Sequence, residues 1–372
     1  MLYIFLVSIG ILLSLLNITK NKIINCLYLI AVIISMVYLM GTVSPYHSFD
    51  TSAYQYMYNL PPISHRFESG YMHLSYYFYL NGFTYEAFRI VSYALFSITM
   101  AIGILQLTPN IVGFYSLYLI FPFFLDVTQV RQFFMFSLVI CGVGLLSTNN
   151  KFFRYIGIFS ILISPLFQTS GLVYYLLFIL IKVDYKKILK IMDYLIWILP
   201  IVTFVIHYGN LNRIFSKALE LVLSSRSNGA ESVNLYTQGS SFSFVIFYIL
   251  SICISYFMFR KMIVKLENYA ENKKNLLTIV FFIGILFIPL LASSSDFERF
   301  IRNSIFIFIL TFSIYISQVK IIGSTEWIKG WVGLLCVLIL ITTSWRYWDT
   351  SVTGRNQFLP YIIKVKNPNK LE

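Results

Sequence analysis

Arginine side chains occur in this chain where they could hold an anion. Seven of them lie in the segments that join apolar runs on one side of an alternating pattern, with Lys217 as the only lysine among them. They are Arg66, Arg89, Arg131, Arg213, Arg226, Arg299 and Arg302. A guanidinium grips phosphate or carboxylate through two parallel hydrogen bonds, whereas a lysine ammonium is a hydrated point charge. We therefore expect an anionic ligand on this side.

Three of these arginines open apolar runs in a way that favours ligand binding. Arg131 and Gln132 begin the run at 130–147, and Arg299 and Arg302 lie three apart on one face of a helix near 301–319. Charges at such positions are rare without a function or a partner. The alternative is internal pairing, of Arg131 with Asp126 and of Arg302 with Glu298. For Arg89 we favour the plain reading, in which the side chain reaches the interface beside Glu86.

Carboxylates, a histidine and tyrosines gather in the segment 42–87. Asp50, Glu68 and His65 are groups that could deprotonate a sugar hydroxyl, and Tyr54 and Tyr71 could stack on sugar rings. Arg66 adds a cation to the same segment. A solvated loop with an aromatic interface belt would have a similar composition. Residues 72–80 have helical spacing and are expected to lie along that interface.

The composition places these residues on a membrane protein. Hydrophobic residues make up 58% of the 372 residues, charged residues only 12%, and the mean hydropathy is +0.76. Apolar runs of nearly bilayer-spanning length recur, and in lipid such runs must be helical. We predict an all-α, polytopic integral membrane protein with about twelve transmembrane helices. The runs lie near 2–16, 23–41, 88–106, 110–124, 130–147, 153–166, 168–182, 190–207, 243–260, 276–292, 301–319 and 330–345. The pair around Ser164-Pro165 is short, so a re-entrant hairpin is an alternative there.

Basic residues set the expected orientation. One set of alternate connecting segments holds 15 positive residues, 13 of them lysine, and the other holds eight before the C-terminal tail. The positive-inside rule places the lysine-rich set in the cytoplasm. The whole chain, 1–372, then forms one membrane domain with external loops at about 42–87 and 208–242 and an external tail at about 346–372.

Several function classes are disfavoured. The chain has no phosphate-binding Walker loop, no Gly-x-Ser-x-Gly or His-Glu-x-x-His motif, and no external Asp-x-Asp pair. We therefore expect neither a metal nor another cofactor. The net charge of +13 comes from loop residues and does not form the basic clusters typical of nucleic-acid binding.

The spacing of the polar residues resembles the EpsG family, within the Wzy class of bacterial polysaccharide polymerases. The resemblance covers nearly the whole chain and rests on several short motifs. They are Asp50 with Tyr54, Glu68 to Tyr71, Arg131-Gln132, Gln168-Thr169-Ser170 and Glu298 to Phe300. One position departs from the family, because Gln168 stands where relatives commonly have histidine. Glutamine cannot act as a general base, although it can orient a substrate.

The resemblance implies a glycosyltransferase that polymerises repeat units on the outer face of the bacterial cytoplasmic membrane. Its substrate would be an oligosaccharide on undecaprenyl diphosphate, and its partners could include a flippase and a chain-length regulator. Arg131, Arg299 and Arg302 would converge on the diphosphate, with Arg66 a further candidate. Asp50, Glu68 or His65 would handle the acceptor hydroxyl. Tyr54, Tyr71, Gln132, Gln168 and Glu298 complete the expected substrate-binding set.

Two other classes remain open. A flippase for lipid-linked oligosaccharide would also need cations near a diphosphate, but it should carry charges in the middle of its spans. A membrane O-acyltransferase would need a donor site on the cytoplasmic face, where the sequence has mainly lysines. Neither pattern is evident in the sequence.

Overall fold

The computed structural model describes residues 2–15, 22–42, 49–61, 67–209, 239–318, 325, 328, 330–336 and 338. Within these ranges the chain forms helices and no strands, which confirms the all-α class. The α-helices are α1 (Leu2–Leu15), α2 (Lys22–Gly41), α3 (Phe49–Tyr58), α4 (Ser69–Leu80), α5 (Tyr85–Leu107), α6 (Ile111–Ile120), α7 (Phe123–Thr128), α8 (Val130–Leu146), α9 (Lys151–Ile163), α10 (Leu176–Leu180), α11 (Tyr185–Tyr208), α14 (Phe242–Lys265), α15 (Glu271–Ile285) and α16 (Glu298–Gln318). Four 3-10 helices accompany them, η4 (Ser164–Leu166), η5 (Thr169–Tyr175), η6 (Ile288–Ala292) and η7 (Ser295–Phe297).

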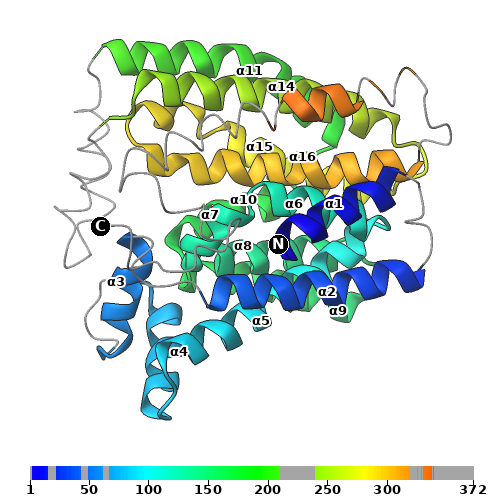
Figure 1. Cartoon of the computed structure of the whole chain (residues 1–372). Helices are drawn as coiled ribbons and strands as arrows, with labels where there is room; N and C mark the ends of the chain where they lie inside the picture. The colour runs from blue at the N-terminus through cyan, green and yellow to red at the C-terminus, as the bar shows by residue number, and fades with distance from the viewer. Residues whose placement is uncertain are drawn as a thin grey trace.

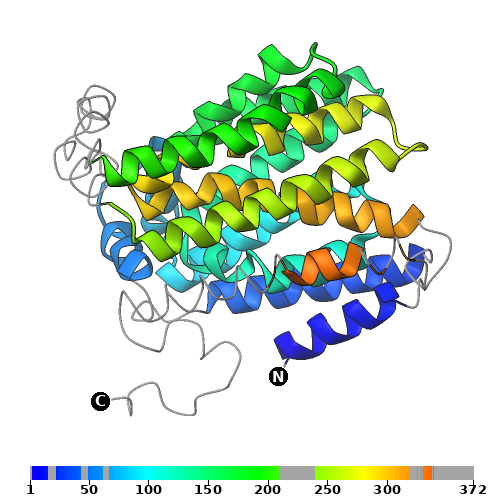
Figure 2. The ribbon, with the colours of Figure 1, turned by 90° about the horizontal axis from the view of Figure 1, so that it is seen from above.

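The long helices run side by side as a bundle (Figures 1 and 2). In the described part of the chain, six helical segments are long and apolar enough to cross a membrane: Lys22–Gly41, Tyr85–Leu107, Tyr185–Tyr208, Phe242–Lys265, Glu271–Ala292 and Ser295–Gln318. The sequence predicted about twelve spans, and that count is not confirmed. Several of the remaining predicted spans are short helices, such as α6 with 10 residues and α9 with 13.

The centre of the bundle is formed by α8 and α16, whose side chains are buried on almost every face. Close backbone approach brings neighbours onto α8, because small residues allow helices in lipid to pack tightly. A Cβ added at Gly142 of α8 would lie only 2.7 Å from the Gly157 carbonyl oxygen of α9. By contrast, α2 and α11 bury only 28% of their apolar windows and form the rim of the bundle.

Three interruptions in the helices occur near prolines and end in an extended or irregular residue. The first separates α7 from α8 at Gln129 and follows Pro122, and the second separates η4 from η5 at Gln168. The third separates η6 from η7 at Ser294. Proline removes a backbone donor and disfavours a continuous helix. Each interruption therefore leaves polar groups that only protein or water can satisfy at membrane depth.

The third interruption also receives a distant segment of the chain. The Gly239 N–H donates to the Ser293 carbonyl at 2.9 Å, and the Ser240 N–H donates to the Ala292 carbonyl at 3.3 Å. Gly239 has a φ of 81°, in the left-handed region that favours glycine. Two main-chain hydrogen bonds thus attach the start of α14 to the end of η6.

The predicted segregation of lysine and arginine corresponds to two ends of the bundle. α3 and α4 lie at one end (Figure 1), near the beginnings of α5 and α8. At the other end, Asn272 donates to the Ser147 carbonyl at 2.9 Å and Tyr269 donates to the Leu107 carbonyl at 2.6 Å. The lysine-bearing 260–274 segment is therefore packed against the ends of α5 and α8 that lie away from α3 and α4.

The two predicted long loops are described only in part. Within 42–87 the structure contains α3 and α4, and α4 includes the predicted helical stretch 72–80. Residues 43–48 and 62–66, most of 208–242, and the tail at 346–372 lie outside the described residues.

Candidate functional site

Arg131 is placed by the restart of a helix after an interruption. Gln129 has φ −96° and ψ 64°, which ends α7, and α8 begins at the next residue. Arg131 consequently lies in the first turn of α8, with its side chain directed toward α3 and the segment before α4. Its Nη1 forms an ion pair with Glu68 Oε2, and its Nε donates to the Tyr54 hydroxyl at 3.2 Å.

Aromatic rings enclose the guanidinium of Arg131. Its central carbon lies 4.3 Å from the ring centroid of Phe67 and 5.5 Å from that of Tyr54. Tyr54 in turn packs against Tyr71, with ring centroids 5.5 Å apart. The rings attract the guanidinium through cation–π contacts. Because the side chain is only 18% exposed, its electrostatic interactions are also less screened by solvent. Tyr71 is 1% exposed, so this predicted substrate-binding residue supports Tyr54 from beneath.

Glu68 binds Arg131 through one carboxylate oxygen and, through the other, Thr169 at the interruption between η4 and η5. It precedes α4 in an extended conformation and makes no side-chain cap bond to that helix. Its Oε1 instead accepts from the Thr169 N–H at 3.0 Å and from the Thr169 hydroxyl at 2.8 Å. Glu68 is therefore the link that fixes Arg131 relative to η5.

The two glutamines predicted for the site lie beside this link. The Ser170 hydroxyl donates to Gln132 Oε1 at 3.3 Å, which joins α8 to η5 a second time. Gln168 has extended backbone angles and is buried immediately before η5. The predicted group Gln168-Thr169-Ser170 is thus brought to Arg131-Gln132, and Thr169 makes the direct contact with the charged pair.

Asp50 occupies the first turn of α3, one turn before Tyr54, and its side chain is exposed. Enough protein nevertheless surrounds it for desolvation to raise the pKa of its carboxyl above the ordinary value. Arg131 and Arg299 both oppose this rise and Asp296 adds to it. The pKa of Asp50 is therefore lowered by the charges of two of the three arginines expected to converge, Arg131 of α8 and Arg299 of α16.

Arg299 is oriented by the third interruption. Its Nε donates to the Asp296 carbonyl at 2.8 Å, and its Nη2 pairs with Asp296 Oδ1 at 3.1 Å. The Ser294 hydroxyl accepts from the Asp296 N–H at 3.2 Å and stabilises the η7 turn. Arg299 remains 15% exposed, which leaves it at the edge of the bundle near Asp50.

Arg302 does not share this arrangement. It is fully buried, and its Nη2 donates to Gln129 Oε1 at 2.7 Å. Its guanidinium pairs with Glu298 Oε1 at 3.3 Å and with Asp126 Oδ1 at 3.9 Å. The Tyr118 hydroxyl donates to the second oxygen of Asp126 at 2.8 Å. We call Asp126, Gln129, Glu298 and Arg302 the sealed network.

These contacts decide between the alternative partners that the sequence left open for Arg131 and Arg302. Glu298 does pair with Arg302, as the plain reading proposed, so neither side chain is presented to a ligand in this structure. Asp126 pairs with Arg302, whereas Arg131 pairs with Glu68. Arg89 is 2% exposed and donates to the Met40 carbonyl, so the expectation that it reaches the interface is wrong.

Some residues of the site were missed or cannot be placed. Phe67 and Gln129 were not singled out, although a glutamine directly before Val130 and Arg131, seven residues after Pro122, was a usable signal for an interruption. His65 and Arg66 lie outside the described residues. Within the described ranges, no group of three or more His, Cys, Asp or Glu side chains is placed to hold a metal ion.

Fold and site together define a class, a helical membrane protein with a charged, aromatic-lined site at one end of its bundle. The chain belongs to the EpsG family, whose model matches residues 27–363. That family indicates a membrane protein of polysaccharide biosynthesis. No curated protein and no solved structure matches the chain.

Proposed function

We propose that this protein polymerises oligosaccharide repeat units carried on undecaprenyl diphosphate, by glycosyl transfer on the outer face of the bacterial cytoplasmic membrane. The observation that carries the proposal is the position of Asp50. An exposed carboxylate of raised pKa feels the charges of Arg131 and Arg299, at the end of the bundle where the described residues include these arginines and no lysine cluster. A carboxylate that feels the charge of two cations suits attack by a hydroxyl and departure of a diphosphate.

The reaction needs one bond made and one broken. The acceptor hydroxyl oxygen forms a bond to the anomeric carbon of the donor chain, and the bond from that carbon to the diphosphate oxygen breaks. The electron pair leaves with the diphosphate, and the hydroxyl proton passes to a base. Because negative charge develops on the leaving oxygen, fixed guanidinium groups stabilise the transition state more than the ground state.

We assign Asp50 as the general base and Arg131 and Arg299 as the groups that bind the diphosphate. Asp50 is exposed to substrate, whereas Glu68 already accepts from Thr169 and pairs with Arg131. Glu68 therefore serves better as a positioning residue than as a base. Arg131 contacts Tyr54 through Nε and Glu68 through Nη1, and a guanidinium has five N–H donors in all.

The remaining predicted residues have supporting roles in this proposal. Tyr54 offers its ring and hydroxyl beside Arg131, and Gln132 and Gln168 line the junction with η5. His65 and Arg66 stay candidates for the acceptor and the diphosphate. Arg302 and Glu298 are reassigned from substrate contact to support of the α7–α8 interruption, since both are sealed in the interior.

The proposal includes a topology. About twelve crossings, with the lysine-rich end in the cytoplasm, place the loops at about 42–87 and 208–242 outside the cell. The separation of lysine-bearing and arginine-bearing segments to opposite ends of the bundle supports this orientation. No nucleotide or metal is required, because the diphosphate linkage already activates the donor sugar.

Replacement of single arginines tests the site. We expect Arg131→Ala and Arg299→Ala to shorten or abolish the surface polymer, read as a ladder on gels, at unchanged protein level in the membrane. Arg154→Ala is the matched control, because Arg154 is exposed on α9 at the lysine-rich end. If both site variants support long chains at normal protein level, the assignment fails.

The cellular phenotype separates polymerisation from translocation. A cell lacking a polymerase should display glycans of a single repeat unit on the outer face. A cell lacking a flippase would instead retain lipid-linked units on the inner leaflet. Labelling of intact cells with a sugar-specific probe, before and after permeabilisation, reads this difference directly.

A further inference from the structure

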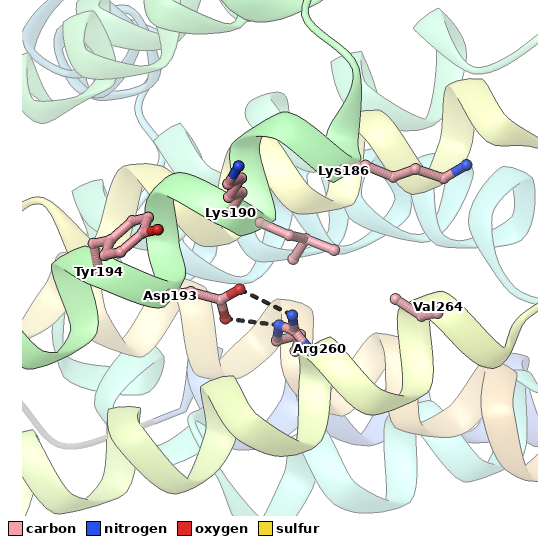
Figure 3. A pocket seen from close by; sticks show the side chains of 7 residues that line it. Lys186, Lys190, Asp193, Tyr194, Arg260 and Val264 are labelled. Atoms are coloured by element: carbon pink, nitrogen blue, oxygen red, sulfur yellow. Dashed lines mark hydrogen bonds and ion pairs between the residues drawn. The ribbon is translucent and has the colours of Figure 1, made fainter.

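A second polar site lies between α11 and α14, near the start of α11 and the end of α14 and far along the chain from Asp50. It is a pocket of about 530 Å³, lined by Lys186, Lys190 and Asp193 of α11 and by Arg260 and Val264 of α14 (Figure 3). Three cations and one carboxylate leave the lining with an excess of two positive charges. The site is therefore suited to an anion.

One of the cations is held rigidly. Arg260 Nε lies 2.7 Å from Asp193 Oδ1, and its Nη2 donates to Asp193 Oδ2 at 2.9 Å, as Figure 3 shows. The Tyr256 hydroxyl also donates to Asp193 Oδ1 at 2.5 Å. Asp193 is thus saturated by donors and acts to orient the guanidinium. The Arg260 side chain is still 46% exposed, so its charge is accessible from the pocket.

An apolar track continues from the pocket along the same face of α11. Lys186, Lys190, Tyr194, Trp197 and Ile201 follow at intervals of three or four residues, which places them on one side of the helix. Tyr194 is 62% exposed, Trp197 66% and Ile201 63%. Along this face of α11, two lysine side chains are followed by the aromatic rings of Tyr194 and Trp197 and then by the aliphatic side chain of Ile201.

The neighbouring helix widens this track. Phe257 of α14 is exposed, and its ring centroid lies 5.7 Å from that of Trp197. Both helices are long and apolar enough to cross a membrane, so these rings face lipid. A phospholipid carries its anionic headgroup next to its acyl chains. A basic pocket that continues into an aromatic and aliphatic groove matches this arrangement, because the pocket suits the headgroup and the groove suits an acyl chain.

We propose that this pocket binds the phosphate of an anionic phospholipid in the leaflet at the lysine-rich end, with an acyl chain along Trp197 and Phe257. Lys190 and Arg260 contact the phosphate from two helices, and Lys186 lies at the open side. This site is separate from the proposed polymerisation site and does not depend on the reaction. A free phosphate would share the headgroup chemistry but would not use the apolar track.

Lipid-dependent stability of the full chain tests the proposal. In neutral detergent, we expect phosphatidylglycerol to raise the unfolding midpoint, and phosphatidylcholine and inorganic phosphate to leave it unchanged. The K186Q/K190Q double variant should weaken phosphatidylglycerol binding about 25-fold, from a contribution of about fivefold for each lysine near an anionic headgroup. The matched control K151Q/R154Q removes the same charge from α9, outside the pocket, and should keep the wild-type response.

A second measurement locates the acyl chain without relying on stability. Phosphatidylglycerol with brominated chains should quench tryptophan fluorescence in the wild type, and Trp197→Phe should remove most of that quenching. If inorganic phosphate raised the unfolding midpoint by the same amount, the pocket would be a site for a soluble anion and the proposal would be overturned. An equal response to phosphatidylcholine, or a K186Q/K190Q variant that behaves like its control, would also overturn it.

Discussion

Two charged clusters of similar composition lie near the interruption between α7 and α8 and differ in their access to solvent. The first contains Asp50, Glu68, Arg131 and Arg299, and its members reach the end of the bundle where α3 and α4 lie. The second is the sealed network, in which Arg302 is 0% exposed and Glu298 is 1% exposed. Both combine carboxylates with guanidinium groups, so residue type does not distinguish them.

The difference indicates what each cluster can do. A sealed ion pair cannot meet a substrate, and its charges are compensated because desolvation of an isolated charge is costly. The first cluster, which we call the exposed cluster because Asp50 is exposed, keeps a carboxylate of raised pKa at the surface. We infer that the sealed network sets the geometry of the interruption and that the exposed cluster is the one available to a substrate.

The largest expected effect is on the sealed network. Arg302→Met should destabilise the protein by about 3–5 kcal/mol, because Asp126 and Glu298 would stay buried without their cation. The measurement is the yield of folded protein and its unfolding midpoint in detergent. Arg131→Met, with the same change at the exposed cluster, should abolish polymer with a smaller loss of stability. Equal destabilisation by the two variants would remove the distinction between the clusters.

The next effect concerns the proposed base. Asp50→Asn should lower the polymerisation rate by about 10²- to 10⁴-fold, the range typical of a lost general base. The assay uses purified protein in liposomes with lipid-linked repeat units. Asp184→Asn is a control at the opposite end, where the carboxylate only caps α11 through the Lys186 N–H at 3.0 Å. A near-normal rate for Asp50→Asn would exclude this residue as the base.

Replacement of the positioning residue should cost less. Glu68→Gln keeps an oxygen for Thr169 but weakens the hold on Arg131, and misplacement of a catalytic group by about 1 Å can cost about 10²-fold in rate. The shape of the pH–rate profile should not change, because the base is intact. A profile that loses its acidic limb in Glu68→Gln would instead identify Glu68 as the base.

The polymerisation rate should also depend on pH, with a change per pH unit that is smaller than the effect of Glu68→Gln. A base must be deprotonated, so the rate should rise about tenfold per pH unit until pH exceeds the pKa of Asp50. Desolvation raises that pKa, so the acidic limb should end above the ordinary aspartate pKa of 3.8. Rates measured across pH in the wild type and in Asp50→Asn check this, and the limb should vanish in the variant. A limb that persists unchanged would point to another group.

The smallest effect is expected at η5. Thr169→Val removes the hydroxyl bond of 2.8 Å to Glu68 but keeps the main-chain donor at 3.0 Å. The loss of one neutral donor to a charged acceptor should lower the rate about tenfold, the low end of what such a bond contributes, because the main-chain donor remains. Ser170→Ala, whose hydroxyl contacts Gln132 and not Glu68, serves for comparison. A loss as large as that of Glu68→Gln would mean that Thr169 contacts the substrate itself.

The sequence allowed the class and part of the site to be predicted. Hydropathy identified the apolar helices, and the segregation of arginine from lysine identified an end of the bundle. The motif positions around Glu68, Arg131 and Thr169 do meet in space. Local patterns succeed here because hydropathy and charge act along the chain over short distances.

Pairing could not be predicted in the same way. Asp126 is five residues from Arg131, yet it pairs with Arg302, which is 176 residues away in the chain. The interruption at Gln129 turns α7 so that Asp126 faces the interior and Arg131 faces α4. Arg89 similarly finds a carbonyl on α2, a contact that depends on how α2 and α5 pack. Such partners are set by tertiary geometry, which a local pattern does not contain.

The attachment of Gly239 and Ser240 to the end of η6 separates two kinds of substitution that this protein can undergo. Its hydrogen bonds join main-chain atoms, which every residue except proline can supply in full. Only the φ of Gly239 depends on residue type. Ser240 can therefore be replaced by any residue except proline without loss of its main-chain bond, whereas Gly239 is held to a conformation that other residues rarely adopt. The contact between these two distant segments therefore depends on backbone conformation at one glycine and not on the neighbouring side chains.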